Sequence, residues 1–166
     1  KCHFCLNPQC HRKMSDSMYL QPQEVFGRTA IDELYYLATG GGVTFGGGEP
    51  LLYSDFIIEV LSLGANKWTV TIETSLNVPY KQVGILLPYI KGLIVDIKDV
   101  NPQIYKSYTQ SDNYKVLENL RLLASTGYAN NVLVRIPLIK GYNTSRDVEN
   151  SKNFLLSIGY SKFDIF

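Results

Sequence analysis

The chain has 166 residues, which is enough for one domain with a hydrophobic core and too few for two comfortable ones. Hydrophobic residues make up 45% of it and charged residues 19%, a composition typical of globular and not of disordered proteins. Sixteen basic and fifteen acidic side chains leave a net charge of +1, so charge gives no argument for nucleic acid or an anionic membrane as a partner. Lys91 interrupts the best candidate for a membrane span, and no other apolar run approaches the required length.

All three cysteines, Cys2, Cys5 and Cys10, fall within the first ten residues. A disulfide framework spreads its cysteines through a chain, so this clustering predicts a metal or cluster site in a reducing compartment, here the cytoplasm. The pair in "CHFC" supplies two thiolates, which suit zinc, a redox dithiol or an iron–sulfur cluster. On the pair alone zinc ranks first, because Cys10, His3 and His11 could complete its ligands.

After the cysteines, residues 6–30 are polar and irregular, ending in a weak helical signal over residues 28–38. A regular alternation of strands and helices then begins. In chain order the pattern predicts strand 41–45, helix 52–64, strand 68–74, helix 80–90, strand 92–98, helices 101–109 and 114–127, strand 131–139, helix 145–159 and strand 162–166. Pro88 is expected to disturb the helix at 80–90. Gly127 is expected to end the helix at 114–127. The nearly continuous apolar run "GLIVDIK" predicts a strand buried on both faces.

Strands that alternate with helices indicate an α/β fold with a parallel sheet. Right-handed crossovers leave two solutions, an open doubly wound sheet and a barrel, and periodicity does not separate them. In both, ligands bind at the carboxyl ends of the strands, which is where functional residues are expected.

Polar residues stand where the predicted strands end, at Gly46–Glu49, Glu73–Ser75, Asp96 with Lys98, and Arg135. Thr74 or Ser75 alone would be explained by helix capping. Asp96 and Lys98, however, are two residues apart in a buried strand, so alternation places both on one face, where charges are costly unless they are used. A structural ion pair is the alternative to a functional role.

The stretch "GGGVTFGGGEPLL", residues 40–52, needs an explanation because glycine weakens a strand. No Gly-Lys-Ser/Thr follows, so it is not a P-loop, and the spacing GxGxxG does not fit. Glu49 would repel a phosphate. Bare backbone carbonyls beside a carboxylate instead suit a cationic group, such as an amine or a sulfonium.

With these residues the sequence resembles the radical S-adenosylmethionine (SAM) superfamily, whose cysteine motif is CxxxCxxC with an aromatic residue before the last cysteine. More narrowly, "GGGVTFGGGEPLL", "VDIKDVNPQIYKSYTQ" and "VLENLRLLASTG" followed by "VLVRIPLIKGYN" resemble the activating enzymes of glycyl radical enzymes, of the pyruvate formate-lyase type. The resemblance covers the whole chain, and the glycine-rich segment is its most specific part. It implies a partial barrel of (β/α) units.

The resemblance also implies roles for the residues of the cysteine and glycine motifs. Cys2 and Cys5 would be two ligands of a [4Fe–4S] cluster, and Phe4 would lie near the adenine of SAM. Gly47, Gly48 and Glu49 would line the methionyl amine, with backbone carbonyls accepting its hydrogens. The glycines would thus let a ligand amine lie against the main chain.

Further roles are implied at the other strand ends. Lys98, beside Asp96, would meet the SAM carboxylate or ribose, Arg135 would lie near the nucleoside, and Ser75 joins the residues implied to contact SAM. Glu73 and Thr74 match the ligands of a monovalent cation, which the Ile94 carbonyl could complete, although this family more often has Asp in place of Glu73.

The resemblance implies a cofactor-based reaction in which one electron cleaves SAM and the 5′-deoxyadenosyl radical removes a hydrogen atom from a glycine of a partner enzyme. No general base or nucleophile is required, and a flavodoxin or ferredoxin would supply the electron. Two other functions stay open. One is a radical SAM enzyme acting on a peptide or small molecule. The other is a zinc-binding interaction domain that uses Cys2, Cys5, Cys10 and a histidine.

Two parts of the family pattern would lie before Lys1, namely the first cysteine of the motif and the first barrel strand. We therefore expect residues 1–166 to form one radical SAM domain that is a fragment of a longer chain. The alternative is that Cys10 serves as the third ligand. Truncation is favoured because the matches continue right up to Lys1.

Overall fold

The computed structural model describes residues 3, 5, 8 and 17–166, and Cys2, Phe4, Cys10 and His11 lie outside this part. The described residues contain a five-stranded sheet in which every neighbouring pair of strands is parallel. Its strands are β1 (Gly42–Phe45), β2 (Thr69–Thr74), β3 (Gly92–Asp96), β4 (Val132–Ile136) and β5 (Phe163–Ile165). The α/β fold with a parallel sheet is thereby confirmed.

Helices connect the strands as the periodicity predicted. The α-helices are α1 (Pro22–Thr29), α2 (Glu33–Thr39), α3 (Ser54–Ser62), α4 (Tyr80–Gly84), α5 (Pro102–Thr109), α6 (Tyr114–Ser125) and α7 (Ser145–Ser157). Short 3-10 helices are η2 (Ala30–Asp32), η3 (Pro50–Tyr53), η4 (Ala65–Lys67), η5 (Leu87–Tyr89) and η6 (Tyr128–Asn131). The predicted helix 80–90 is split into α4 and η5, because Pro88 cannot donate a backbone hydrogen bond.

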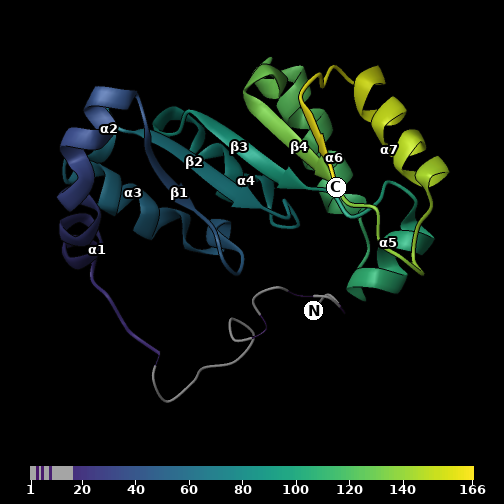
Figure 1. Cartoon of the computed structure of the whole chain (residues 1–166), viewed down its shortest axis with the longest axis horizontal. Coiled ribbons are helices and arrows are strands. Elements are labelled where there is room, and N and C mark those ends of the chain that lie inside the picture. Colours follow the sequence, from purple (N-terminus) through teal and green to yellow (C-terminus); the bar gives the residue numbers. More distant parts are fainter. Residues whose placement is uncertain (1–2, 4, 6–7, 9–16) are drawn as a thin grey trace.

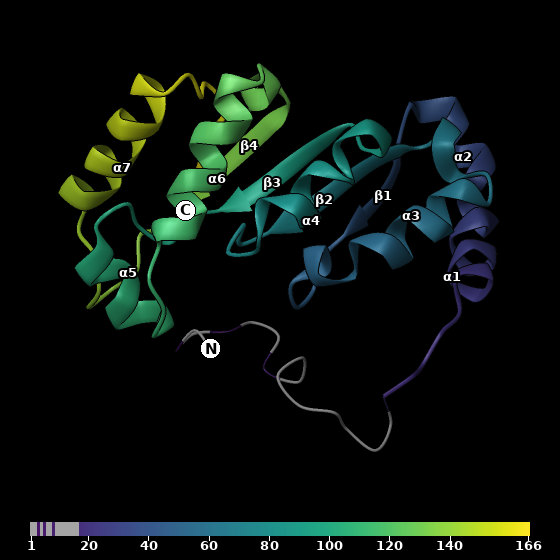
Figure 2. The ribbon, with the colours of Figure 1, turned by 180° about the vertical axis from the view of Figure 1, so that it is seen from behind.

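The order of the strands distinguishes a barrel from a doubly wound sheet. The strands lie side by side in the order β1-β2-β3-β4-β5, with no reversal in the middle of the sheet. Helices α3, α4 and α6 lie on one face of the sheet, in front of the strands in Figure 2 and behind them in Figure 1. A doubly wound sheet reverses its strand order and has helices on both faces, so this sheet follows the winding of a barrel.

The face of the sheet beneath the helices forms the hydrophobic core. Val70 and Ile72 of β2, Val95 of β3, and Val134 and Ile136 of β4 are all at most 1% exposed. They alternate with the residues that point to the other face, as the two-residue period of a strand requires. We call that second face of the sheet the inner face.

The inner face is polar and half-buried, which corrects one expectation. Strand β3 is buried on its helical face alone, because Ile94 and Asp96 on the inner face are each only partly covered. The other inner-face residues of the central strands include Thr69, Thr71, Glu73, Leu133 and Arg135. Within the described ranges no second layer covers them, so the apolar run of β3 reflects one buried face and not two.

Helix α1 corrects the expectation that residues 6–30 are irregular. Its sequence, "PQEVFGRT", contains glycine and threonine, which are poor helix formers. Two contacts stabilise it: the Glu24 carboxylate accepts from the Gln21 N–H at 2.7 Å, and Phe26 stacks on Trp68 with ring centroids 5.5 Å apart. Tertiary packing therefore outweighs weak local propensity.

No helix in the described part of the chain is long and apolar enough to cross a membrane.

Candidate functional site

The carboxyl end of β1 is joined to the carboxyl end of β2 by the carboxylate of Glu49. Its Oε1 accepts from the Thr74 hydroxyl at 2.6 Å and from the Leu51 N–H at 3.3 Å. Its Oε2 accepts from the Ser75 hydroxyl at 2.6 Å and from the Ser75 N–H at 3.0 Å. Four donors thus surround one carboxylate, which fixes the direction in which the chain leaves β1.

Two glycines of the segment from β1 to Glu49 are required for different physical reasons: Gly42 at the amino end of β1 and Gly47 in the turn after it. A Cβ on Gly42 would lie 1.9 Å from the Thr69 carbonyl oxygen, so a side chain there would prevent β1 from pairing with β2. Gly47 has φ +105°, a conformation that residues with a Cβ rarely adopt. A Cβ built on Gly47 would meet nothing within 4 Å, and Gly46–Gly48 are exposed. The turn therefore presents bare backbone to open space.

Beside this turn, charged side chains from three strands form a network on the inner face. Arg135 donates from Nε to Asp96 Oδ1 at 2.9 Å, and its NH2 group lies 3.0 Å from Glu73 Oε1. Lys98 Nζ lies 3.1 Å from Asp96 Oδ2. We call Glu73, Asp96, Lys98 and Arg135 the charge network. Because Asp96 is the register partner of Arg135 in β3 and β4, parallel pairing itself brings these two side chains together.

The charge network confirms that Asp96 and Lys98 share a face. Strand β3 ends at Asp96, yet the next residue, Ile97, is fully buried on the helical face, so Lys98 returns to the inner face. The charges are 18% to 37% exposed. The two acids and two bases balance, so the structural ion pair considered from the sequence is present.

The structure does not bring Glu73 and Thr74 together as ligands of one cation. Consecutive residues of β2 point to opposite faces, so Glu73 lies on the inner face with Arg135, whereas Thr74 is 2% exposed on the helical face. The Thr74 hydroxyl is already bound to Glu49. Strand alternation, which the sequence showed, was the signal against pairing these two side chains.

One residue of the cysteine motif is placed by its contacts. His3 contacts residues at the end of α5, and Cys5 is a half-buried free thiol. The predictions for Cys2 as a cluster ligand and Phe4 as a SAM contact fall outside the described residues. Among residues 3, 5, 8 and 17–166 no three histidine, cysteine or acidic side chains gather into a metal site.

A buried acid, which the sequence patterns did not single out, organises the loops at this edge. Asp99 is 1% exposed and accepts from the Asn101 N–H at 2.9 Å, with the Asn143 amide and the Ser151 hydroxyl each at 3.4 Å. Asn113 donates to its backbone carbonyl at 3.2 Å. Burial raises the pKa of Asp99 above its ordinary value. An acid in the apolar run "LIVDIKDV" was the available signal.

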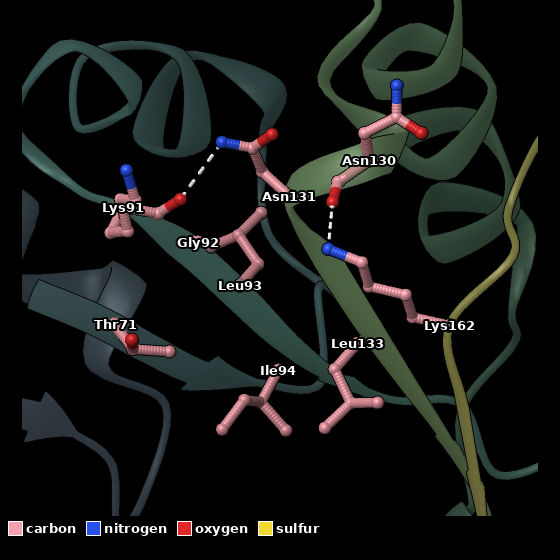
Figure 3. Close-up of a pocket in the computed structure, with 9 residues that line it drawn as sticks. All are labelled: Thr71, Lys91, Gly92, Leu93, Ile94, Asn130, Asn131, Leu133 and Lys162. Carbon is pink, nitrogen blue, oxygen red and sulfur yellow. Dashed lines mark hydrogen bonds between the residues drawn. The ribbon is translucent and has the colours of Figure 1, made fainter.

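A hollow of about 450 Å³ lies at the other end of the sheet (Figure 3). Thr71, Ile94 and Leu133 line it from the inner face, and Lys91 and Lys162 line it from the amino ends of the strands. Of the described residues assigned to the site from the sequence, Ile94 lines this hollow, whereas the glycine turn and the charge network do not. The candidate site is therefore the carboxyl edge, where the glycine turn and the charge network lie.

This edge suits a ligand that carries both an amine and a carboxylate. Exposed backbone beside Glu49 can accept from an amine, while the N–H groups of Lys98 and Arg135 can donate to an anion. Both kinds of group belong to one sheet edge, the carboxyl ends at which parallel α/β folds bind ligands.

Comparison with known proteins adds sequence and fold relatives. The family model described as "Radical SAM superfamily" matches residues 1–155. The chain is 41% identical over 128 residues to a (2S)-3-sulfopropanediol dehydratase activating enzyme of Klebsiella oxytoca, covering 76% of this chain and 40% of that protein. It is 34% identical over 118 residues to the pyruvate formate-lyase 2-activating enzyme of Escherichia coli K12, covering 70% and 39%. The chain thus spans about two fifths of the length of these relatives.

The fold is also similar to a solved structure, Streptococcus suis SuiB bound to S-adenosylmethionine. The TM-score is 0.68 with 17% sequence identity, and the match covers 99% of this chain and 35% of that one. At this identity the likeness concerns the fold alone.

Proposed function

Because the chain belongs to the radical SAM superfamily, as the match over residues 1–155 shows, we propose that it is the SAM-binding part of an enzyme that activates a glycyl radical enzyme. The observation that carries this proposal is the exposed glycine turn held by Glu49 next to the charge network. Relatives that are themselves named activating enzymes support the choice of reaction. The protein would be an oxidoreductase that uses radical chemistry.

The superfamily implies a [4Fe–4S] cluster and SAM as cofactors. In this proposal Cys2 and Cys5 supply two thiolates to the cluster, the third comes from a cysteine before Lys1, and Phe4 lies near the adenine. When bound, these groups supply one-electron cleavage of SAM to the 5′-deoxyadenosyl radical, which takes a hydrogen atom from a glycine of the partner.

The residues of the carboxyl edge would bind and orient SAM. The carbonyls of Gly47 and Gly48 accept from its amine, and the open space above Gly47 leaves room for that group. Glu49 acts here through its hydrogen bonds to Thr74 and Ser75, which hold the turn in place.

The charge network would serve the other polar groups of SAM. Lys98 meets the carboxylate or the ribose, with Asp96 orienting its ammonium group, and Arg135 lies near the nucleoside. A monovalent cation near the carboxylate stays a prediction. Because Thr74 is turned to the helical face, Glu73 is the side chain left to serve that cation.

The proposed partners follow from the proposed reaction. A glycyl radical enzyme would be the protein substrate, and a flavodoxin or ferredoxin the electron donor. Both electron donors and the oxygen-sensitive cluster suit an anaerobic cytoplasm, which is where we propose that the protein works.

The proposal is tested by anaerobic iron and sulfide analysis of the full-length protein after reconstitution. About four irons per chain are expected, whereas one zinc and no cluster would overturn the proposal in favour of a zinc-binding domain. A glycyl EPR signal is then expected when SAM, reductant and the candidate partner are mixed with the loaded protein. SAM cleavage without that signal, but with a modified peptide or small molecule, would assign the protein to another radical SAM reaction.

A further inference from the structure

His3, which stands between Cys2 and Cys5 in the sequence, is bound to residues more than a hundred positions away. The backbone N–H of His3 donates to the backbone carbonyl of Tyr108 at 3.1 Å. Its Nε2 lies 3.0 Å from Nε2 of Gln110, and because an amide nitrogen only donates, the imidazole accepts. The imidazole also lies against the ring of Tyr142, with centroids 6.1 Å apart.

The three residues that receive His3 form one surface, which we call the α5 platform: Tyr108, Gln110 and Tyr142. The rings of Tyr108 and Tyr142 meet edge to face at 82°, with centroids 5.3 Å apart. Lys98 Nζ lies 6.0 Å from the centre of the Tyr108 ring. Contacts therefore run without interruption from His3 through the platform to the charge network.

The backbone of Gln110 is a second, independent observation. Gln110 closes α5 with φ +61°, in the left-handed region, and its N–H donates to the Lys106 carbonyl at 2.8 Å. Glycine is the usual residue at such a helix end because a Cβ is unfavourable there. A glutamine in this conformation indicates that its side chain has a use, and the His3 bond is the use that the structure shows.

We propose that His3 is a positioning residue that docks the segment of residues 2–5, which carries Cys2 and Cys5, onto the α5 platform. An anchor at His3 acts within two residues of both proposed cluster ligands, Cys2 and Cys5, and ties them to the sheet edge that carries Lys98. This inference rests on the proposed function only for the identity of the group that the cysteines hold. The docking itself is a property of the protein without cofactors.

Hydrogen exchange of the residue-3 amide in the cluster-free full-length protein tests the docking. Gln110→Gly removes the amide donor and relieves the left-handed backbone, so the urea midpoint is expected to stay equal or to rise. The protection factor of the residue-3 amide should nevertheless fall about fivefold, the effect of losing one hydrogen bond. His3→Ala should do the same, whereas His3→Gln, which keeps an acceptor, should recover most of the protection.

Gln103→Ala, an exposed glutamine of the same helix, is the matched control and should leave the protection unchanged. Protection within twofold of the parent value in Gln110→Gly would overturn the docking. In the reconstituted protein, Gln110→Gly should lose its cluster absorbance to a chelator about five times faster than the parent, and an unchanged rate would overturn the positioning role. A parent protein that takes up no iron would overturn the proposed function, and the docking would then be judged by exchange alone.

Discussion

The hydroxyl of Thr74 donates a 2.6 Å hydrogen bond to Oε1 of Glu49, so that the last residue of β2 holds the turn that follows β1. Thr74 lies on the helical face, 2% exposed, while the turn itself is exposed at the carboxyl edge. A buried hydroxyl thereby fixes an exposed segment of backbone. This is the kind of support by which a rigid sheet positions a loop for binding.

Replacing Glu49 tests whether this support matters for binding. Glu49→Gln keeps the shape of the side chain but turns a donor toward Ser75, so two donors face each other and the turn loses its fixed direction. We expect a cost of about 1–3 kcal/mol in the free energy of unfolding and at least tenfold weaker SAM binding by titration calorimetry. Glu59→Gln, on the exposed side of α3, is the control and should bind like the parent. Equal SAM affinity in Glu49→Gln would show that the turn keeps its conformation without the hydrogen bonds of Glu49.

Arg135 is the centre of the charge network, so its loss should leave Glu73 without its partner in the network and Asp96 paired with Lys98 alone. Arg135→Met is expected to lower the free energy of unfolding by about 1–2 kcal/mol, since the ion pairs are partly exposed and screened by solvent. Urea unfolding at low and high salt is the measurement. The difference from the parent should shrink at high salt, because salt weakens the parent's ion pairs. Arg146→Lys on α7 serves as the exposed control, and a difference that salt does not change would contradict the electrostatic account.

The buried acid Asp99 predicts a dependence of stability on pH. Its pKa is raised in the folded protein above the ordinary 3.8, chiefly by burial, so the folded state holds its proton more tightly than the unfolded state. The resulting stability is present below the unfolded pKa and is lost as pH rises through the folded pKa. Asp99→Asn removes this loss, so the variant should gain stability relative to the parent as pH rises from about 3.5 to about 7.

Urea unfolding of parent and Asp99→Asn across that range is the measurement, and a difference in the free energy of unfolding that is constant with pH would contradict the prediction.

Asp147, whose pKa is lowered by its hydrogen bonds to Thr144, gives a pH dependence of stability with the opposite sign. Its contribution is present above the unfolded pKa and lost as pH falls through the folded one. Asp147→Asn should therefore lose stability relative to the parent as pH rises.

The contact between Phe26 and Trp68 predicts how α1 is held. Phe26→Ala removes the ring stacked on Trp68 and should lower the free energy of unfolding by about 2 kcal/mol. Trp68 is the only tryptophan of the chain and is 6% exposed, so its fluorescence should shift to longer wavelength as water reaches it. Tyr35 lies on α2 and is 70% exposed, so Tyr35→Ala is the control and should change neither the free energy of unfolding nor the fluorescence of Trp68. An unshifted spectrum in Phe26→Ala would mean that α1 does not cover Trp68.

Much of the fold followed from local pattern. The five strands and the helices between them lie where the periodicity predicted, since apolar residues recur at the spacing each element needs. The start of α5 also agrees with the helix predicted over residues 101–109, where Asn101 accepts from the Gln103 N–H at 2.9 Å. The exception was α1, which depends on the Trp68 ring just before β2 and not on its own residues.

The α/β class, the strand ends that carry polar residues and the resemblance to the radical SAM superfamily can all be read from the order of the amino acids. These depend on composition, period and motif, which are properties of neighbours along the chain. Which polar residues meet is visible only in the folded chain: Arg135 with Asp96 and Glu73, Glu49 with Thr74, and His3 with Gln110. Each of these pairs joins residues that are far apart in the sequence. Parallel pairing and strand alternation, which act across the sheet, bring Arg135 to Asp96 and Glu73, and the packing of loops against the sheet edge brings the other pairs together.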